Sequence, residues 1–488
     1  MNRAYNPYLP SYEYVPDGEP HIFEGRLYVF GSHDRYDGTD YCENDYVAWS
    51  APLEDLSDWR YEGIIFKKEQ DPRNRECKRA LQAPDVVYHN GKYYLYYCPG
   101  GLSCMGVAVC DRPGGSYEFL GYVRHADGMS LGEKKGDGFA FDPGVFRDED
   151  GRIWLYFGFA PMNAQMEKMV NPDGLWKRGA FVAELCEDMQ TFKGNPLPVE
   201  ITGCPGKEHT FFEASSMRKI NGKYYFIYSS QNSHELCYAI GTQPAGPFVY
   251  GGVLHSNGDI GLPGITEENR QNYTGNNHGS IIEINGQWYV FGHRMTNYTL
   301  FSRQGVAEPL TIEANGKICQ AEMTSGGLGG ILPWQGHFEA RTACILRAKE
   351  GAVHCNASGA ALEEMKKIHP AFVQSGEDRE DQPDQYITNL RDGAMAGFRY
   401  FEACGDRQIC VETRGAKGMM EVYGADHTLA ARIPLTEGKD WHISETVMLH
   451  LPEGRQTLLF VYRGDGAEDF RSFTLKAKNG SDGVDFYP

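Results

Sequence analysis

The chain has 488 residues and carries 47 basic against 66 acidic side chains, a formal net charge of −19. This charge excludes a nucleic acid or an anionic membrane surface as the main partner, because phosphate-rich surfaces repel such a field. A neutral ligand is favoured instead. Hydrophobic residues make up 41% of the chain, which is typical of a globular protein with one large or two medium domains.

The first residues include no apolar stretch typical of a signal peptide, and no later segment is as long as a membrane span. We therefore expect a cytoplasmic protein that has no membrane partner. The 13 cysteines are scattered without CxxC pairs. This pattern predicts buried free thiols rather than disulfides or zinc ligands.

One phrase occurs five times in the first three hundred residues: a glycine, usually a basic residue, and then a run of aromatic and aliphatic strand formers. The glycines are Gly25, Gly91, Gly151, Gly222 and Gly286, which lie 66, 60, 71 and 64 positions apart. A second apolar run precedes each glycine, which predicts a β-hairpin. About sixty residues per unit leave room for roughly four strands, so the repeat predicts a five-bladed β-propeller over residues 1–330. Two packed sheets with coincidental hairpins are the alternative.

The period ends near Gly326-Gly-Leu-Gly-Gly, which we interpret as a hinge. Shorter strand-like runs with polar breaks follow over residues 340–488, and about eight of them predict a β-sandwich of the jelly-roll kind. Helices are expected to be few, with residues 361–367 as one short example. The predicted fold class is therefore all-β, with a propeller followed by a sandwich.

Each of the five units also has one ionisable side chain shortly before its glycine. In chain order these are Glu19, Asp85, Asp142, Glu213 and His278. The innermost strands of a propeller begin at the same end of the central channel, so these side chains are expected to meet around one axis. Burying several carboxylates around one axis is costly unless they have a function.

Hydrolysis of a glycosidic bond is the leading chemistry for such a ring. It needs one carboxylic acid to protonate the departing oxygen and one carboxylate to activate water on the opposite face. Opposed blades place such groups across a channel, at about 6.5–9.5 Å rather than the shorter distance of retaining enzymes. Inversion of configuration is therefore expected.

The first 320 or so residues resemble glycoside hydrolase family 43, whose members are five-bladed propeller enzymes that act on arabinose- and xylose-containing polysaccharides. The matching segments are Gly18-Glu-Pro-His-Ile-Phe, Gln82-Ala-Pro-Asp-Val-Val-Tyr, Phe141-Asp-Pro-Gly-Val-Phe, Phe212-Glu-Ala-Ser-Ser-Met, Asn277-His-Gly-Ser-Ile and Gly292-His-Arg. Their order and spacing together are specific, whereas each segment alone is weak.

The resemblance implies three catalytic carboxyl groups. Glu213 falls where the family keeps its general acid, and Asp142 falls where it keeps the carboxylate that orients the acid and raises its pKa. Glu19 falls at the general base, although the family has aspartate directly before that proline. Asp17, two positions earlier and on the same face of a strand, is the alternative base.

The resemblance also implies residues that bind the substrate or a metal. Arg294 matches an arginine that contacts the sugar and the catalytic carboxylates, and Phe141 would form an apolar wall. Gln82 replaces the family tryptophan, which removes a stacking platform. His278 matches a histidine that faces a calcium ion or water in the channel, and a histidine hydrogen-bonded inside a strand is the alternative. Asp85 is taken as structural first, and no organic cofactor is expected.

The second domain is similar to a family 6 carbohydrate-binding module, through the runs that begin at Tyr386 and Gly464. Such a domain would bind sugars on exposed aromatic rings, or it would buttress the propeller and help to wall the active site. Together these inferences predict an exo-acting inverting α-L-arabinofuranosidase that releases arabinose from arabinoxylan-derived oligosaccharides. A β-xylosidase, or an enzyme with both activities, is one alternative. A propeller that binds sugar without cleaving it is another.

Overall fold

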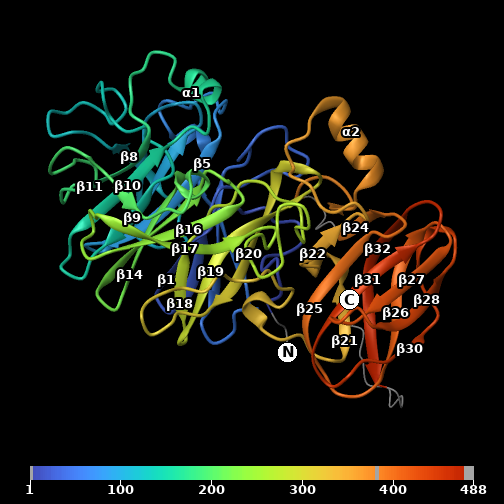
Figure 1. The fold of residues 1–488 in the computed structure, drawn as a ribbon. Helices are drawn as coiled ribbons and strands as arrows, with labels where there is room; N and C mark the ends of the chain where they lie inside the picture. Colours follow the sequence, from blue (N-terminus) through green and yellow to red (C-terminus); the bar gives the residue numbers. More distant parts are fainter. Residues whose placement is uncertain (1–3, 380–383, 478–488) are drawn as a thin grey trace.

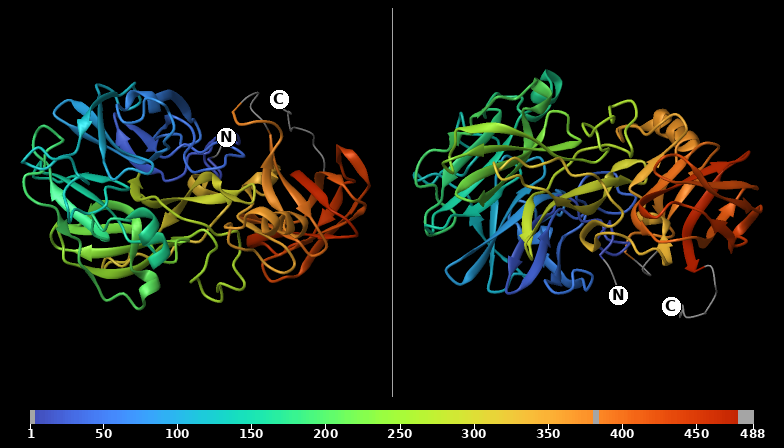
Figure 2. Two further views of the ribbon diagram at one scale, coloured as in Figure 1. Left: turned by 90° about the horizontal axis from the view of Figure 1, so that it is seen from above. Right: turned by 60° about the horizontal axis from the view of Figure 1, so that its bottom comes forward.

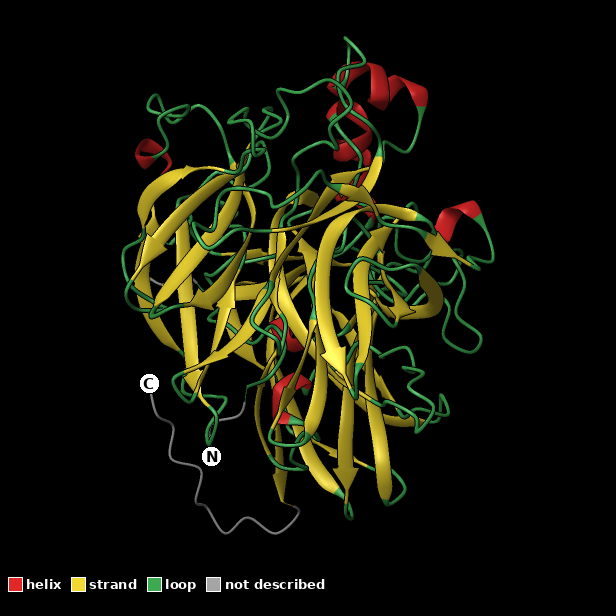
Figure 3. Ribbon diagram, turned by 90° about the vertical axis from the view of Figure 1, so that its left-hand side faces the viewer, coloured by secondary structure: helices red, strands yellow, loops and turns green. Residues whose placement is uncertain are grey.

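The computed structural model describes residues 4–379 and 384–477, and nearly all of its regular structure is β-strand (Figures 1 and 3). Within these residues, five sheets are built from strands that end by Leu310 and two from strands that begin at Gly336. The two groups occupy opposite sides of the molecule in the views of Figures 1 and 2, where the second is coloured orange to red. The predicted all-β class, a propeller followed by a sandwich, is confirmed.

The five sheets of the first group are the blades of the propeller. The first contains β1 (Glu19–Phe23), β2 (Arg26–Phe30), β3 (Tyr46–Pro52) and β4 (Arg60–Phe66). The second contains β5 (Leu81–His89), β6 (Lys92–Pro99), β7 (Gly106–Cys110) and β8 (Glu118–Tyr122). The third contains β9 (Gly144–Arg147), β10 (Ile153–Phe159), β11 (Gly179–Glu184) and β12 (Leu197–Pro198). The fourth contains β13 (Ile201–Thr202), β14 (Phe211–Ile220), β15 (Lys223–Ser230), β16 (Glu235–Gly241) and β17 (Phe248–Ser256). The fifth contains β18 (Ile281–Ile284), β19 (Gln287–Thr296) and β20 (Thr299–Leu310).

The repeated glycine phrase forms the hairpin between the first two long strands of each blade. In the second blade, Asn90 and Gly91 make the two-residue turn between β5 and β6 with φ of 48° and 84°. Asn285 and Gly286 repeat this geometry between β18 and β19 with φ of 52° and 85°. Positive φ at both positions is what a type I′ turn requires, and its twist matches that of the strands.

Hydrophobic cores between neighbouring blades close the propeller into a ring. Four cores join the blades in chain order, from the first and second to the fourth and fifth. Another joins the first blade to the last, with Val29 and Trp49 packed in one cluster with Phe291 and Ala307. The blades therefore follow one another around a common centre, as the view from above shows (Figure 2). This arrangement places β1, β5, β9, β14 and β18 side by side around the central channel.

The second group of strands forms a sandwich of two sheets. One sheet contains β21 (Gly336–Glu339), β23 (Ala371–Gln374), β24 (Gln385–Leu390), β26 (Arg407–Gly415), β29 (Gly438–Ile443), β30 (Val447–Leu449) and β32 (Glu468–Ala477). The other contains β22 (Ile345–Arg347), β25 (Met395–Ala403), β27 (Gly418–Tyr423), β28 (Leu429–Leu435) and β31 (Gly454–Arg463). Phe398, Phe460 and Phe473 pack together in the core between them.

Helical structure is limited to short segments. They are α1 (Ala164–Val170), α2 (Gly359–Ile368) and the 3-10 turns η1 (Lys68–Gln70), η2 (Lys207–His209), η3 (Gly327–Gly329) and η4 (Ala340–Thr342). The predicted helix at residues 361–367 lies within α2. The expected hinge is instead a tight turn at η3, where Gly327 and Leu328 are buried. Neither α-helix in the described ranges has the length and apolar character needed to cross a membrane.

Candidate active site

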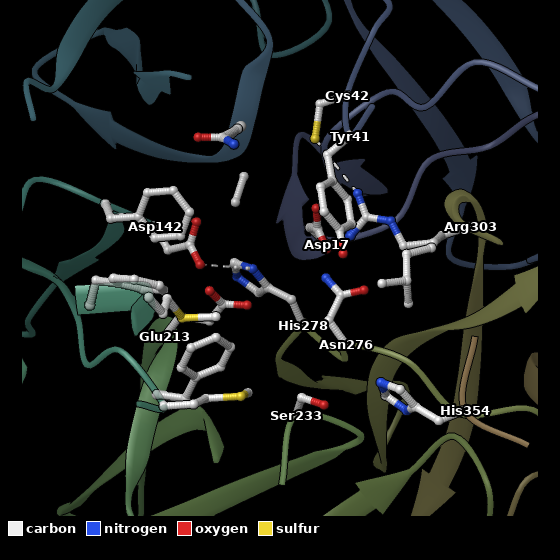
Figure 4. Close-up of a pocket in the computed structure, with 18 residues that line it drawn as sticks. Asp17, Tyr41, Cys42, Asp142, Glu213, Ser233, Asn276, His278, Arg303 and His354 are labelled. Atoms are coloured by element: carbon white, nitrogen blue, oxygen red, sulfur yellow. Dashed lines mark hydrogen bonds and ion pairs between the residues drawn. The ribbon is translucent and has the colours of Figure 1, made fainter. Parts of the chain in front are cut away.

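Three blades present carboxyl groups to one cavity at the mouth of the channel (Figure 4). Asp17 lies just before β1, Asp142 just before β9, and Glu213 near the start of β14. The cavity has a volume of about 370 Å³, which is within the usual range for small-ligand sites. Asp17 and Asp142 are only 4% and 3% exposed, so they form the floor of the cavity.

The backbone is unusual at the starts of the inner strands that surround the cavity. Asp17, Asp142 and Ala214 have φ of 58°, 45° and 67°, and Ala83 at the start of β5 has φ of 23°. Residues other than glycine rarely adopt such angles, and strain of this kind gathers at functional sites. The register of β14 also shifts on both sides of Glu213. These departures from regular strand geometry direct the carboxyl groups into the cavity.

Asp17 is held in its ionised form by a buried arginine. Nη1 of Arg303 lies 2.8 Å from Oδ1 of Asp17, and Nε and Nη2 of the same guanidinium bind Asp34 at 2.8 and 2.9 Å. Burial raises the pKa of Asp17, and the charge of Arg303 is the largest of the opposing effects that together bring the pKa below its usual value. Asp17 is therefore a carboxylate at neutral pH.

A neutral histidine, His293, accepts a hydrogen bond from the backbone of Asp17. Nε2 of His293 donates a hydrogen bond to the carbonyl oxygen of Asn276 at 2.7 Å, which leaves Nδ1 as the acceptor for the amide of Asp17 at 3.4 Å. Burial, followed by the nearby Arg303, lowers the pKa of His293 to about 3. His293 thus fixes the position of Asp17 without adding a charge.

Glu213 and Asp142 have the opposite tendency and retain a proton. Burial raises the pKa of Glu213 to about 8, and the charge of Asp17 adds to this shift. Burial, followed by the proximity of Glu213, raises the pKa of Asp142 well above its usual value. Oδ2 of Asp142 accepts a hydrogen bond from the amide of Ala214 at 3.1 Å and lies 3.6 Å from Nδ1 of His278. The cavity therefore combines an ionised carboxylate with a carboxyl pair that holds a proton, and the pair titrates as a unit.

The walls of the cavity differ in polarity. One wall is apolar and is lined by Phe141, Phe159, Phe212, Met162 and Met166. The remaining wall carries polar groups, namely those of Tyr41, Gln82, Ser233, Asn276 and His354. A sugar ring has an apolar face and hydroxyl groups along its edge, so this cavity is matched to a sugar.

The structure brings together most of the site residues expected from the sequence. Asp142, Glu213, His278, Phe141 and Gln82 all line the cavity. Glu19 and Arg294 do not.

The structure corrects the expectation that Glu19 is the general base. Its side chain is 1% exposed, and Oε2 binds Nη2 of Arg218 at 2.9 Å and Oγ of Ser216 at 3.2 Å. Asp17 and Glu19 were expected on one face of a strand, but β1 begins only at Glu19, and Asp17 has a left-handed backbone. Strand alternation does not extend to Asp17, so only Asp17 faces the cavity.

Arg294 is a second correction. It lies on β19 and donates through Nη1 to the carbonyl oxygens of Arg341 and Ala343, at 2.6 and 3.2 Å. Its guanidinium lies 3.8 Å from the centre of the ring of Phe372. Arg294 therefore joins the propeller to the sandwich, and it does not line the cavity.

Several cavity residues were missed by the sequence analysis. Arg303 could have been found, because it is the one basic residue of the largely buried strand β20. Asn276 directly precedes the matching segment that begins at Asn277, so its position gave a signal. Tyr41 and His354 lie in loops without a recognisable motif, so the sequence gives no signal for them.

Asp85 supports the channel. Its Oδ1 accepts from the amide of Val86 at 2.7 Å and contacts Nε2 of His21 at 2.6 Å, and its Oδ2 accepts from the amide of Val145 at 2.7 Å. These bonds tie β5 to β9.

The side chains around His278 do not fit a calcium ion. Calcium requires several oxygen ligands, and the two nearest carboxylates are bound by Arg303 and by the amide of Ala214. In residues 4–379 and 384–477, two groups of side chains have the spacing of metal ligands, and neither includes His278. One of them contains Glu19, whose carboxyl group already accepts a hydrogen bond from Arg218.

Comparisons with known proteins identify the family of the chain. The model of glycosyl hydrolases family 43 matches residues 24–318. The chain is 44% identical to a xylosidase/arabinosidase of Thermoclostridium stercorarium, over 97% of this chain and 99% of that protein. The family model ends before the sandwich, so the resemblance of that domain to a carbohydrate-binding module stays a prediction.

Two solved structures extend the comparison. One is a family 43 β-xylosidase/α-arabinofuranosidase from a compost microbial metagenome, described as a calcium-free complex with xylotriose. Its sequence is 25% identical, the TM-score is 0.51, and the match covers 66% of this chain and 98% of that chain. The other is a family 43 arabinoxylan arabinofuranohydrolase of Bacillus subtilis, 21% identical with a TM-score of 0.50, which covers 98% of both chains and shows the fold of both domains. From the family match and the whole-length relative, we conclude that the chain belongs to glycosyl hydrolases family 43 and is a glycoside hydrolase.

Proposed function

We propose that the protein is an exo-acting, inverting α-L-arabinofuranosidase that releases arabinose from arabinoxylan-derived oligosaccharides. One observation carries the proposal: Asp17 and Glu213, from two separate blades, meet in a single cavity, with Arg303 bound to Asp17. The pKa of Asp17 lies below its usual value, whereas burial raises the pKa of Glu213 to about 8. Two carboxyl groups whose pKa values differ in this way are suited to act as base and acid.

The proposed reaction assigns a role to each of these groups. Glu213 donates its proton to the glycosidic oxygen as the bond to the anomeric carbon breaks. Asp17 accepts a proton from the water that attacks this carbon from the opposite face, which inverts its configuration. Arg303 keeps Asp17 ionised, and Asp142 keeps a proton available on the Asp142–Glu213 pair.

Exo action fits the form of the site. The floor of the cavity is closed by buried side chains, including Asp17, Asp142, His278 and Arg303, which are at most 4% exposed. A terminal sugar fits against such a floor, whereas a continuous chain would need a groove that is open at both ends. The apolar wall around Phe141 supports packing of one sugar face.

A β-xylosidase activity, alone or as a second activity, is the alternative. The relative from Thermoclostridium stercorarium is named a xylosidase/arabinosidase, and the compared structure from the compost metagenome contains xylotriose. Both names support a substrate that contains xylose or arabinose. The third candidate, a propeller that binds sugar without cleaving it, depended on the loss of the base and loses its support with Asp17 in the cavity.

Two further expectations stay predictions. A calcium ion in the channel is supported by one compared family structure, which is described as a calcium-free form. The side chains around His278 argue against calcium binding. The cytoplasmic location has no further support.

The test compares hydrolysis of 4-nitrophenyl α-L-arabinofuranoside with that of 4-nitrophenyl β-D-xyloside, together with arabinose release from arabinoxylan oligosaccharides of defined branching. Proton NMR of the first product gives its anomeric configuration. We expect faster hydrolysis of the arabinofuranoside and a product of inverted configuration. Retention would refute the mechanism, and inactivity on every glycoside would refute the function.

A further inference from the structure

One residue of the catalytic cavity comes from outside the propeller. His354 lies in the loop between β22 of the sandwich and α2, and it lines the cavity together with residues of the blades. In Figure 4 it lies across the cavity from Asp142 and Glu213, on a separate segment of the chain, with Ser233 to one side.

This loop is fixed to the propeller by a short stretch of backbone pairing. The amide of Thr274 donates to the carbonyl oxygen of Val353 at 3.2 Å, and the amide of Cys355 donates to the carbonyl oxygen of Thr274 at 2.8 Å. Thr274 is fully buried. His354 therefore has a defined place, because its two neighbours are held by the buried Thr274 in the connection between β17 and β18.

The hydrogen bonds around Thr274 determine which nitrogen of His354 carries the proton. Nη1 of Arg270 donates to Oγ1 of Thr274 at 2.7 Å, since a guanidinium can only donate. Oγ1 of Thr274 also lies 3.1 Å from Nδ1 of His354, and among the described residues it has no other acceptor for its own proton. The hydroxyl therefore donates to Nδ1. The neutral imidazole then carries its proton on Nε2, on the side of the ring that remains available to a ligand.

Charge supports the neutral form. Burial, followed by the nearby Arg270, lowers the pKa of His354. At neutral pH the ring is thus an uncharged donor, which suits a sugar hydroxyl.

The position of His354 in the cavity indicates which part of the substrate it contacts. Asp17 and Asp142 lie on the buried floor, whereas Glu213, His354 and Ser233 are half-buried and Met162, on the apolar wall, is 36% exposed. If the enzyme acts on chain ends as proposed above, the terminal sugar occupies the floor. The saccharide from which it is cleaved then passes between Met162 and His354.

We propose that His354 is a specificity-determining residue whose Nε2–H donates a hydrogen bond to a hydroxyl of the xylose-containing chain that leaves in the reaction. This assignment rests on the proposed function of the same cavity. It gives the sandwich domain a direct part in selecting the substrate, because this donor is supplied by a loop of that domain.

The experiment compares a substrate that has sugar hydroxyls in its leaving group with one that has none. The two substrates are a xylo-oligosaccharide with a single arabinose branch and 4-nitrophenyl α-L-arabinofuranoside. If the wild type prefers xylosides, xylobiose takes the place of the oligosaccharide, and 4-nitrophenyl β-D-xyloside takes the place of the arabinofuranoside. The variants are His354→Ala and His354→Gln, whose amide keeps a donor near Nε2. The control is His337→Ala, which removes a histidine of the sandwich that likewise contacts a threonine, Thr474 at 3.1 Å, and lies outside the cavity.

Loss of one neutral hydrogen bond is expected to lower kcat/KM of His354→Ala on the oligosaccharide about three- to tenfold. The loss on the nitrophenyl glycoside should be clearly smaller than on the oligosaccharide, His354→Gln should recover most of the loss, and His337→Ala should behave as the wild type. An equal loss on both substrates, or no loss on the oligosaccharide, would overturn the assignment while leaving the proposed function intact. A wild-type protein inactive on all four substrates would overturn the proposed function itself.

Discussion

Asp17 and Glu19 lie two positions apart in the sequence, and paired substitutions distinguish their roles. In Asp17→Asn the amide cannot accept a proton from the attacking water. General base catalysis contributes about 10²–10⁴-fold, so kcat should fall by this factor, which corresponds to about 3–5 kcal/mol at 1.36 kcal/mol per tenfold. Asn is nearly isosteric with Asp, and Arg303 keeps its two bonds to Asp34, so the fold should be retained.

Glu19→Gln is the matched control on the neighbouring carboxyl group. Burial, followed by the charge of Asp85, raises the pKa of Glu19 to about 8, so the neutral form predominates at pH 7 and glutamine resembles it. Its amide oxygen can still accept the hydrogen bond from Arg218. We expect kcat/KM within about threefold of the wild type, because the side chain does not reach the cavity.

The assay is the initial rate on 4-nitrophenyl α-L-arabinofuranoside at pH 7. Near-UV circular dichroism and thermal melting of both variants report whether the fold is kept. The assignment of the base is wrong if Glu19→Gln loses about 100-fold or more with an unchanged melting curve while Asp17→Asn stays active.

Three further predictions concern charge and packing. Glu213 must be protonated to act as the acid and its pKa is about 8, so kcat/KM should fall as the pH rises through about 8; a rate that stays constant to pH 10 would contradict this role. In Arg303→Lys a single ammonium nitrogen cannot reproduce the three guanidinium bonds to Asp17 and Asp34, so the pKa of Asp17 should rise. The acidic limb of the pH profile should therefore move to higher pH, and an unmoved limb would argue against Asp17 as the group seen there. Arg294→Met leaves buried carbonyl oxygens at the domain interface without their hydrogen-bond donor. Denaturant titrations should therefore show a free energy of unfolding that is lower by about 1–3 kcal/mol, with little change in kcat/KM. A loss of activity without a loss of stability would mean that Arg294 belongs to the active site.

The amino-acid sequence was sufficient to predict the architecture, because the architecture depends on local features that are repeated. The turns at Gly91 and Gly286 need positive φ, and the apolar runs after them form the strands that pack between the blades. Five such units at a regular spacing fit a closed ring. The same register identified Asp142 and Glu213, since each lies at the start of an inner strand and so reaches the same end of the channel.

Only the tertiary structure decided which neighbouring side chains complete the site. The choice between Asp17 and Glu19 depended on a left-handed residue that ends the strand alternation. The roles of Arg294 and Arg303 depended on which face of the β19–β20 hairpin packs against the second domain. The sequence by itself could not indicate His354, because its contact with the cavity arises from the packing of one domain on another. Local periodicity can be seen in the sequence because it depends on neighbouring residues. The direction of a side chain at an irregular backbone position depends on residues far away in the sequence, and so do the contacts between domains.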